Sequence, residues 1–110
     1  MSSQITETQY HDLVDQLLLA IEERLDDFAV DIDTESAEGI LTLTFENGSK
    51  MVLNKQEPLL QLWVATKFNG HHFNYADGEW IDQRGAGEFW AFLDEAMTVQ
   101  AEQPVVLGMK

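Results

Sequence analysis

The spacing of the apolar residues changes twice along this chain, and this change most constrains how the chain can fold. Between about Thr6 and Phe28, apolar residues recur at i, i+3, i+4 and i+7, the spacing of an amphipathic helix. From residue 30 to residue 81 the spacing falls to two, which predicts short strands. Helical spacing returns near Phe89 and continues to about Ala101. The order predicts an α+β two-layer sandwich, in which the N- and C-terminal helices pack on one face of an antiparallel sheet of about five or six strands.

Three turn dipeptides divide the predicted strands: Asn47-Gly48, Asn69-Gly70 and Asp77-Gly78. Asn-Gly between alternating strands favours a hairpin with a type I′ turn, in which both central residues have positive φ. Pro104 is expected to stop the second helix. The apolar tail 105–107 is then expected to cover an edge of the core.

Length and composition exclude several kinds of protein. A chain of 110 residues without repeats or linkers predicts a single domain, residues 1–110. It has no cysteine, which excludes disulfides, thiolate metal sites and cysteine nucleophiles. Its first residues lack the features of a secretion signal, and no apolar run is long enough to span a bilayer. A pI near 4.2 argues against nucleic acid and anionic membranes as partners. We expect a cytoplasmic protein.

Acidic residues are concentrated at the start of the chain. Residues 1–38 hold eleven of the twenty carboxylates and a single basic side chain, Arg24, giving a formal charge of −10. Glu22/Asp26 and Glu23/Asp27 are like-charge i, i+4 pairs, and such pairs destabilise a helix. Asp26 and Asp27 also stand at the negative end of the helix dipole. We call the following set the acidic ridge: Glu22, Glu23, Asp26, Asp27, Asp31, Asp33 and Glu35.

Three interpretations of the acidic ridge follow from these residues. An ordinary solvated face normally mixes lysine and arginine among its acids, and this one offers only Arg24. Clustered carboxylate oxygens suit hard cations such as iron, manganese, magnesium or calcium, bound weakly near the surface. The same charges would also dock a protein surface rich in lysine and arginine. A calcium EF-hand beginning at Asp31 is excluded, because Ser36 and Thr42 replace the required Gly and Glu.

Two further side chains are candidates for binding. If Leu60, Leu62 and Val64 face the core, Trp63 points outward beside Gln61, the placement of an interface anchor. His11 lies at the edge of the acidic helix face and is a candidate metal ligand. The chain has no Ser-His-Asp arrangement, HExxH motif or dinucleotide fingerprint, and we expect no enzymatic activity.

Several segments resemble the frataxin family. Ile21-Glu22-Glu23-Arg24-Leu25-Asp26-Asp27 is similar to the end of the first helix of bacterial frataxins, and residues 44–50 (TFENGSK) resemble their first hairpin. Asn54-Lys55-Gln56-Glu57-Pro58, followed by Gln61-x-Trp63 and Gly70-x-His72-Phe73, resembles the signature stretch of the family. Phe89-Trp90-x-x-Leu93 is similar to the second helix. The resemblance covers nearly the whole chain.

The resemblance implies a non-catalytic protein of iron–sulfur cluster assembly. Such proteins bind ferrous and ferric iron weakly through the acidic ridge, and bacterial members regulate cluster formation by docking on the cysteine desulfurase and its scaffold protein. The resemblance implies that the iron ligands are the residues of the acidic ridge, and that Glu7 and His11 are outlying ligands. The partner contacts are Glu22, Asp26, Asp31, Asp33, Gln61 and Trp63. The expected state is a monomer, and the resemblance allows iron-dependent oligomers. The alternative is a purely acidic interaction module, or an inhibitor of a basic partner, with incidental metal binding.

Overall fold

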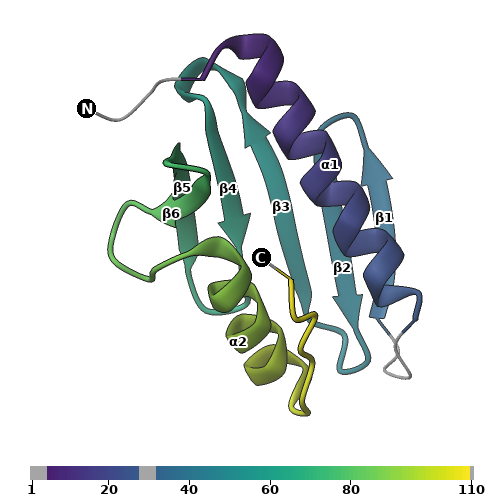
Figure 1. Ribbon diagram of the computed structural model, residues 1–110. Coiled ribbons are helices and arrows are strands. Elements are labelled where there is room, and N and C mark those ends of the chain that lie inside the picture. Colours follow the sequence, from purple (N-terminus) through teal and green to yellow (C-terminus); the bar gives the residue numbers. More distant parts are fainter. Residues whose placement is uncertain (1–4, 28–31, 110) are drawn as a thin grey trace.

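The computed structural model describes residues 5–27 and 32–109, and its two helices cover one face of a six-stranded antiparallel sheet (Figure 1). The strands lie side by side in chain order, each paired with the next. This arrangement confirms the predicted two-layer α+β sandwich. The elements are α1 (Glu7–Leu25), β1 (Ile32–Ala37), β2 (Ile40–Phe45), β3 (Lys50–Gln56), a 3-10 turn η1 (Glu57–Leu59), β4 (Gln61–Ala65), β5 (Gly70–Ala76), β6 (Glu79–Asp82) and α2 (Phe89–Ala101).

The helix α1 begins at a capping box. The hydroxyl of Thr6 accepts a hydrogen bond from the Gln9 amide, and the Gln9 side chain accepts one from the Thr6 amide. The apolar stripe of α1 is buried against the sheet as predicted, but the helix ends at Leu25, before the predicted limit at Phe28. Phe28, Val30 and Asp31 lie outside the described residues.

The turn at Asn47-Gly48 is not the predicted type I′ turn. Gly48 has a φ of +87°, whereas Asn47 does not adopt positive φ. The Gly48 amide donates to the Phe45 carbonyl and the Phe45 amide to the Ser49 carbonyl, the pattern of a type I turn followed by a left-handed residue. The side chain of Asn47 donates to the Gln100 carbonyl at 2.7 Å, and this bond joins the loop to α2. The structure has the predicted turn at Asp77-Gly78, and there both residues have positive φ.

The C-terminal tail completes the core. The helix α2 ends at Ala101 with Glu102 in the left-handed conformation, two residues before Pro104. Val105 and Leu107 are 1% exposed, which confirms that the tail covers the core. The carboxylate of Asp94 accepts from the Leu107 amide at 2.8 Å, and the Thr98 hydroxyl accepts from the Val105 amide at 2.9 Å. These bonds hold the tail along α2.

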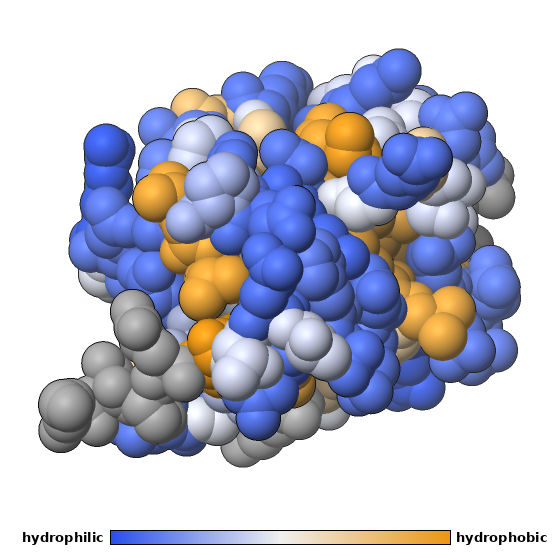
Figure 2. Space-filling model, turned by 90° about the horizontal axis from the view of Figure 1, so that it is seen from above, coloured by the Kyte–Doolittle hydropathy of each residue, from blue (hydrophilic) through white to orange (hydrophobic). Residues whose placement is uncertain are grey.

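The face of the molecule at the end where α1 begins is mainly hydrophilic (Figure 2). Seen from the end where α1 begins, apolar residues form small separate patches between polar ones (Figure 2). Neither helix is long and apolar enough to cross a lipid bilayer over the residues described.

Candidate metal and partner-binding site

The last turn of α1 and the two residues that follow it present four carboxylates of the acidic ridge. Glu22 and Asp26 are one turn apart, and so are Glu23 and Asp27, which places each pair on one side of the helix. Glu22 is half-buried, and the other three are exposed. The salt bridges between described residues involve other carboxylates, namely Asp15, Glu57 and Asp82. The four carboxylates of the acidic ridge at the end of α1 form no salt bridge with the described residues, so they are available to an external cation.

The carboxylates of β1 lie on the other side of the sheet. In the strand register, Asp33 stands opposite Thr44 and Glu35 opposite Thr42. Ile32, their neighbour in β1, packs against the core under the helices. Because alternate residues of a strand point to opposite faces, Asp33 and Glu35 lie on the open face, the sheet face that carries no helix. The acidic ridge is thus divided between the helix layer and the open face, and Asp31 lies outside the described residues.

This division limits how the acidic ridge can coordinate a metal. Within residues 5–27 and 32–109, no three His, Asp or Glu side chains come close enough together to hold one ion. The possible ligand sets on these residues are the one-turn pairs of α1 and the alternating pair of β1. Hard cations accept such carboxylate oxygens and retain water in the remaining positions. The geometry suits weak surface binding of several ions better than a single closed site.

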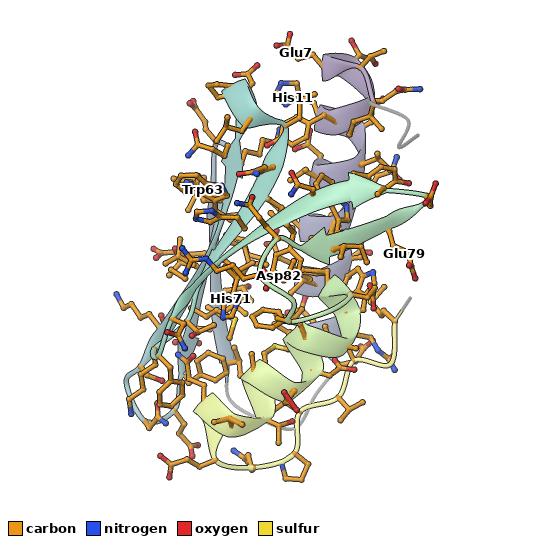
Figure 3. All side chains as sticks on the ribbon, turned by 90° about the vertical axis from the view of Figure 1, so that its left-hand side faces the viewer. Glu7, His11, Trp63, His71, Glu79 and Asp82 are labelled. Atoms are coloured by element: carbon orange, nitrogen blue, oxygen red, sulfur yellow. The ribbon has the colours of Figure 1, made fainter. Side chains whose placement is uncertain are left out.

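His11, predicted as an outlying ligand, belongs to a chain of polar contacts. Its Nε2 lies 2.9 Å from the Glu57 carboxylate, and its Nδ1 lies 2.9 Å from Nζ of Lys55. The same ammonium group is 2.7 Å from Oδ1 of Asp15. Lys55 therefore takes the position of a cation between His11 and Asp15. Glu7 is exposed in the first turn of α1, at the same end of the molecule as His11 (Figure 3).

Trp63 lies on the open face, on the side of the sheet away from α1 (Figure 3). It is half-buried and stands between Asn54 and His72 in the register. Its indole stacks on the His72 ring with centroids 4.2 Å apart and planes 12° from parallel. This orientation agrees with the sequence prediction that Trp63 points out of the core.

Gln61, predicted to point outward beside Trp63 and to contact a partner, is covered by neighbouring side chains. Gln61 is only 9% exposed. Its amide donates to Asn74 at 3.1 Å and to Gln83 at 2.9 Å, and its Oε1 accepts from Trp63. Gln83, in the loop after β6, supplies a contact that a pattern along β4 cannot reveal. Gln61 fixes the Trp63 indole through the hydrogen bond to Oε1 and presents little surface of its own to a partner.

Asp82 is a buried acid that was not predicted as a site residue. This side chain is buried at the end of β6, where Oδ2 accepts from the Ala86 amide at 2.9 Å and lies 3.8 Å from Nδ1 of His71. Oδ1 has no hydrogen-bond partner among the described residues. The contact with Ala86 ties the loop before α2 to the sheet. In the sequence, the only feature that could have indicated this role of Asp82 is its charge at the end of a predicted strand.

Comparison with known proteins identifies the family. The model of the frataxin-like domain matches residues 3–103. This chain belongs to the frataxin-like family. The iron-sulfur cluster assembly protein CyaY of Pseudoalteromonas atlantica is 62% identical over 101 residues, covering 92% of this chain and 94% of that protein. The protein of the same name from Colwellia psychrerythraea is 52% identical over 104 residues, covering 94% and 98%.

Solved frataxins share the fold of this frataxin-like chain. Frataxin from Psychromonas ingrahamii superposes with a TM-score of 0.87 at 39% identity, covering 96% of this chain and all of that one. Trimeric yeast frataxin complexed with ferrous iron gives a TM-score of 0.70 at 27% identity, covering 94% and 92%. The family resemblance of the sequence is confirmed.

Proposed function

We propose that this frataxin-like chain is an iron-binding protein of iron–sulfur cluster assembly. It regulates cluster formation by docking the acidic ridge on a cysteine desulfurase and its scaffold protein, as an iron donor or an iron sensor. The observation that carries the proposal is the pair of CyaY relatives, which are named for cluster assembly and match nearly the full chain. The yeast frataxin complexed with ferrous iron supports iron as the cargo.

The chemistry of the acidic ridge fits that cargo. Carboxylate oxygens bind ferrous and ferric ions, and exposed carboxylates bind them without a large desolvation cost. Glu22 with Asp26, and Glu23 with Asp27, can each bridge one ion across a helical turn. Asp33 and Glu35 form a separate set on the open face. Each bound cation also relieves repulsion in a region of high negative charge.

The docking surfaces follow from charge and exposure. The carboxylates of α1 and β1 suit a basic surface on the desulfurase, with fast association that falls at high salt. Trp63, stacked on His72, suits a contact of the open face with the scaffold protein. The protein works in the cytoplasm as a monomer. It acts without catalytic residues and binds neither nucleic acid nor membranes. Iron loading drives the monomers to assemble into oligomers, an idea supported by the trimeric yeast frataxin complexed with ferrous iron.

The iron proposal is tested by paramagnetic broadening in amide NMR spectra with substoichiometric ferrous iron. We expect two separate groups of broadened signals, one around Glu22–Asp27 and one around Asp33–Glu35. The variant Glu22→Gln, Glu23→Gln, Asp26→Asn, Asp27→Asn should lose the first group and keep the second. Equal broadening of the whole spectrum would contradict specific sites.

A matched control separates position from net charge. Glu46, Asp77, Glu79 and Glu95 are exposed acids outside the acidic ridge. Replacing them with their amides changes the net charge by the same amount, from −14 to −10. This control variant should retain both groups of broadened signals.

The regulatory proposal is tested in a reconstituted assembly reaction with desulfurase, scaffold, cysteine and a range of iron concentrations. The wild-type chain should change the rate of cluster formation, and the size of the change should depend on iron. The variant in the four α1 acids should lose the effect, while the matched control keeps it. A rate unaffected by the wild-type chain at every iron concentration would overturn the proposal.

One observation favours a second candidate, an acidic interaction module or inhibitor of a basic partner with incidental metal binding. No group of three metal-binding side chains occurs in the described part of the chain. The assembly reaction distinguishes the two functions. An interaction module would change the rate equally in iron-limited and iron-rich mixtures.

A further inference from the structure

We propose that the protein binds a basic partner segment through an apolar groove within its acidic surface, and that the groove receives one apolar side chain of that partner. The groove lies between α1 and the turn that joins β1 to β2, and its volume is about 250 Å³. The inference rests on the proposed function, because it describes how the acidic surface recognises its partner.

Leu19 supplies the apolar side chain of the lining that remains exposed, and Ile40 borders the groove at the turn. Leu19 is 53% exposed on α1, and Ile40 is 40% exposed at the start of β2. Leu18, which is buried, closes the groove beside them. The Ile40 side chain belongs to the open face, since its neighbour Leu41 is buried in the core and its partner in the register is Asn54. The exposed side chain of Leu19 beside the buried Leu18 is the apolar surface that water solvates poorly.

Carboxylates surround this apolar lining. Asp15 and Glu22 stand four residues before and three residues after Leu19, which places all three on one side of α1. Glu38 contributes a third carboxylate from the opposite wall. Gly39, with a φ of +77°, allows the tight turn that brings Glu38 and Ile40 to the groove. The rim is therefore negative and the centre apolar.

The charges of the rim select the occupant. Among the described residues, only Asp15 of these three carboxylates forms a salt bridge, to Lys55 at 2.7 Å. Lys55 shows that an ammonium group fits the rim, and Asp15 is itself 63% exposed. Glu22 and Glu38 remain for lysine or arginine side chains of the partner. An apolar residue flanked by basic ones complements this arrangement, while an acidic or uniformly polar segment does not.

The apolar centre and the charged rim have different roles in binding. Exposed charges accelerate association and are screened by salt, whereas burial of an apolar side chain slows dissociation and is insensitive to salt. The acidic ridge alone would attract any basic surface. The groove adds selectivity for a basic segment that also carries a leucine-sized side chain at the right position.

The test uses two synthetic helical peptides of about fifteen residues. Both carry the same lysines, and they differ in one central residue that is Leu in the first peptide and Ser in the second. We expect the Leu peptide to bind the wild-type protein about five- to tenfold more tightly, at low and at high salt. Leu19→Gln should abolish this preference. Glutamine retains a good helix propensity, so the variant should stay folded.

Val99 supplies the matched control, since it is 55% exposed on the other helix, α2. Val99→Gln should keep the preference for the Leu peptide. Equal affinity of the wild-type protein for both peptides would overturn the groove proposal, and so would a preference that survives Leu19→Gln.

A parallel titration of the cysteine desulfurase with wild-type protein separates this proposal from the proposed function. Desulfurase binding without any peptide preference refutes the groove and leaves the proposed function standing. A peptide preference that depends on Leu19, without desulfurase binding, supports the groove and counts against the proposed partner.

Discussion

The indole Nε1 of Trp63 donates a 2.7 Å hydrogen bond to Oε1 of Gln61, a side chain only 9% exposed. The half-buried aromatic ring on the open face is therefore anchored in a partly buried polar network. Gln61 continues that network to Asn74 and Gln83. Changes at Trp63 consequently affect stability as well as any contact made by the ring.

Trp63→Phe should lower the free energy of unfolding by about 1–3 kcal/mol, because Oε1 of Gln61 loses its donor in a buried position. The phenyl ring can still stack on His72. Chemical denaturation of Trp63→Phe, Gln61→Ala and the double variant gives the coupling energy between the two side chains. Fully additive effects in this double-mutant cycle would mean that the hydrogen bond contributes nothing.

Tyr10→Phe should lower the free energy of unfolding by about 1–3 kcal/mol. The buried Tyr10 hydroxyl donates to the Gln61 carbonyl at 2.7 Å and accepts from the Gln56 amide at 2.9 Å, so its removal leaves both backbone groups unpaired. Denaturant titration measures the loss. Tyr75→Phe is the matched control, since the Tyr75 hydroxyl makes no hydrogen bond within the described residues, and it should change stability little. Equal losses in the two variants would refute the assigned role of the Tyr10 hydroxyl.

The same residue predicts how stability depends on alkaline pH. Burial raises the pKa of the Tyr10 phenol above its usual value of 10.0, with the Gln56 amide opposing and Glu57 and Asp15 adding to the rise. The unfolded chain therefore ionises first. The contribution of Tyr10 is fully present below pH 10 and is lost as pH rises through the higher folded pKa. Between pH 9 and 11 the wild-type protein should lose stability more steeply than Tyr10→Phe, and parallel declines would contradict this prediction.

Gln100→Met should lower the free energy of unfolding by about 2 kcal/mol, because several partly buried polar groups lose a partner at once. Gln100 is 1% exposed, and its amide donates to the Lys50 carbonyl at 2.8 Å and to Ser49. Its Oε1 accepts from the Lys67 amide, so the side chain joins α2 to two loops of the sheet. The exposed Gln16→Met on α1 controls for the change of side chain. Thermal unfolding with equal midpoints for both variants would show that these bonds are dispensable.

The spacing of apolar residues predicted the layers and the strand order because the period of a helix or strand directly reflects which face is buried. It could not predict the depth of Gln61, since Asn74 and Gln83 cover it from later parts of the chain. The ion pair of Lys55 with Asp15 is equally non-local, joining β3 to α1. The alternation of Ile32 with Asp33 and Glu35 puts the two acids on one face of a strand, but only the pairing with β2 shows that this is the face without helices.

Asp26→Asn and Asp27→Asn should each raise the free energy of unfolding by about 0.3–1 kcal/mol in metal-free buffer. Asp26 is the C-cap of α1, where a negative charge opposes the helix dipole, and each residue repels a glutamate one turn earlier. Thermal unfolding in a chelating buffer measures the gain, and Asp12→Asn in the N-terminal half of the helix should show no such gain. In saturating iron the wild-type protein should instead be more stable than either variant, because it alone keeps every ligand and iron binding stabilises it. Unchanged or lower stability of both variants without metal would show that these carboxylates have stabilising contacts in the fold.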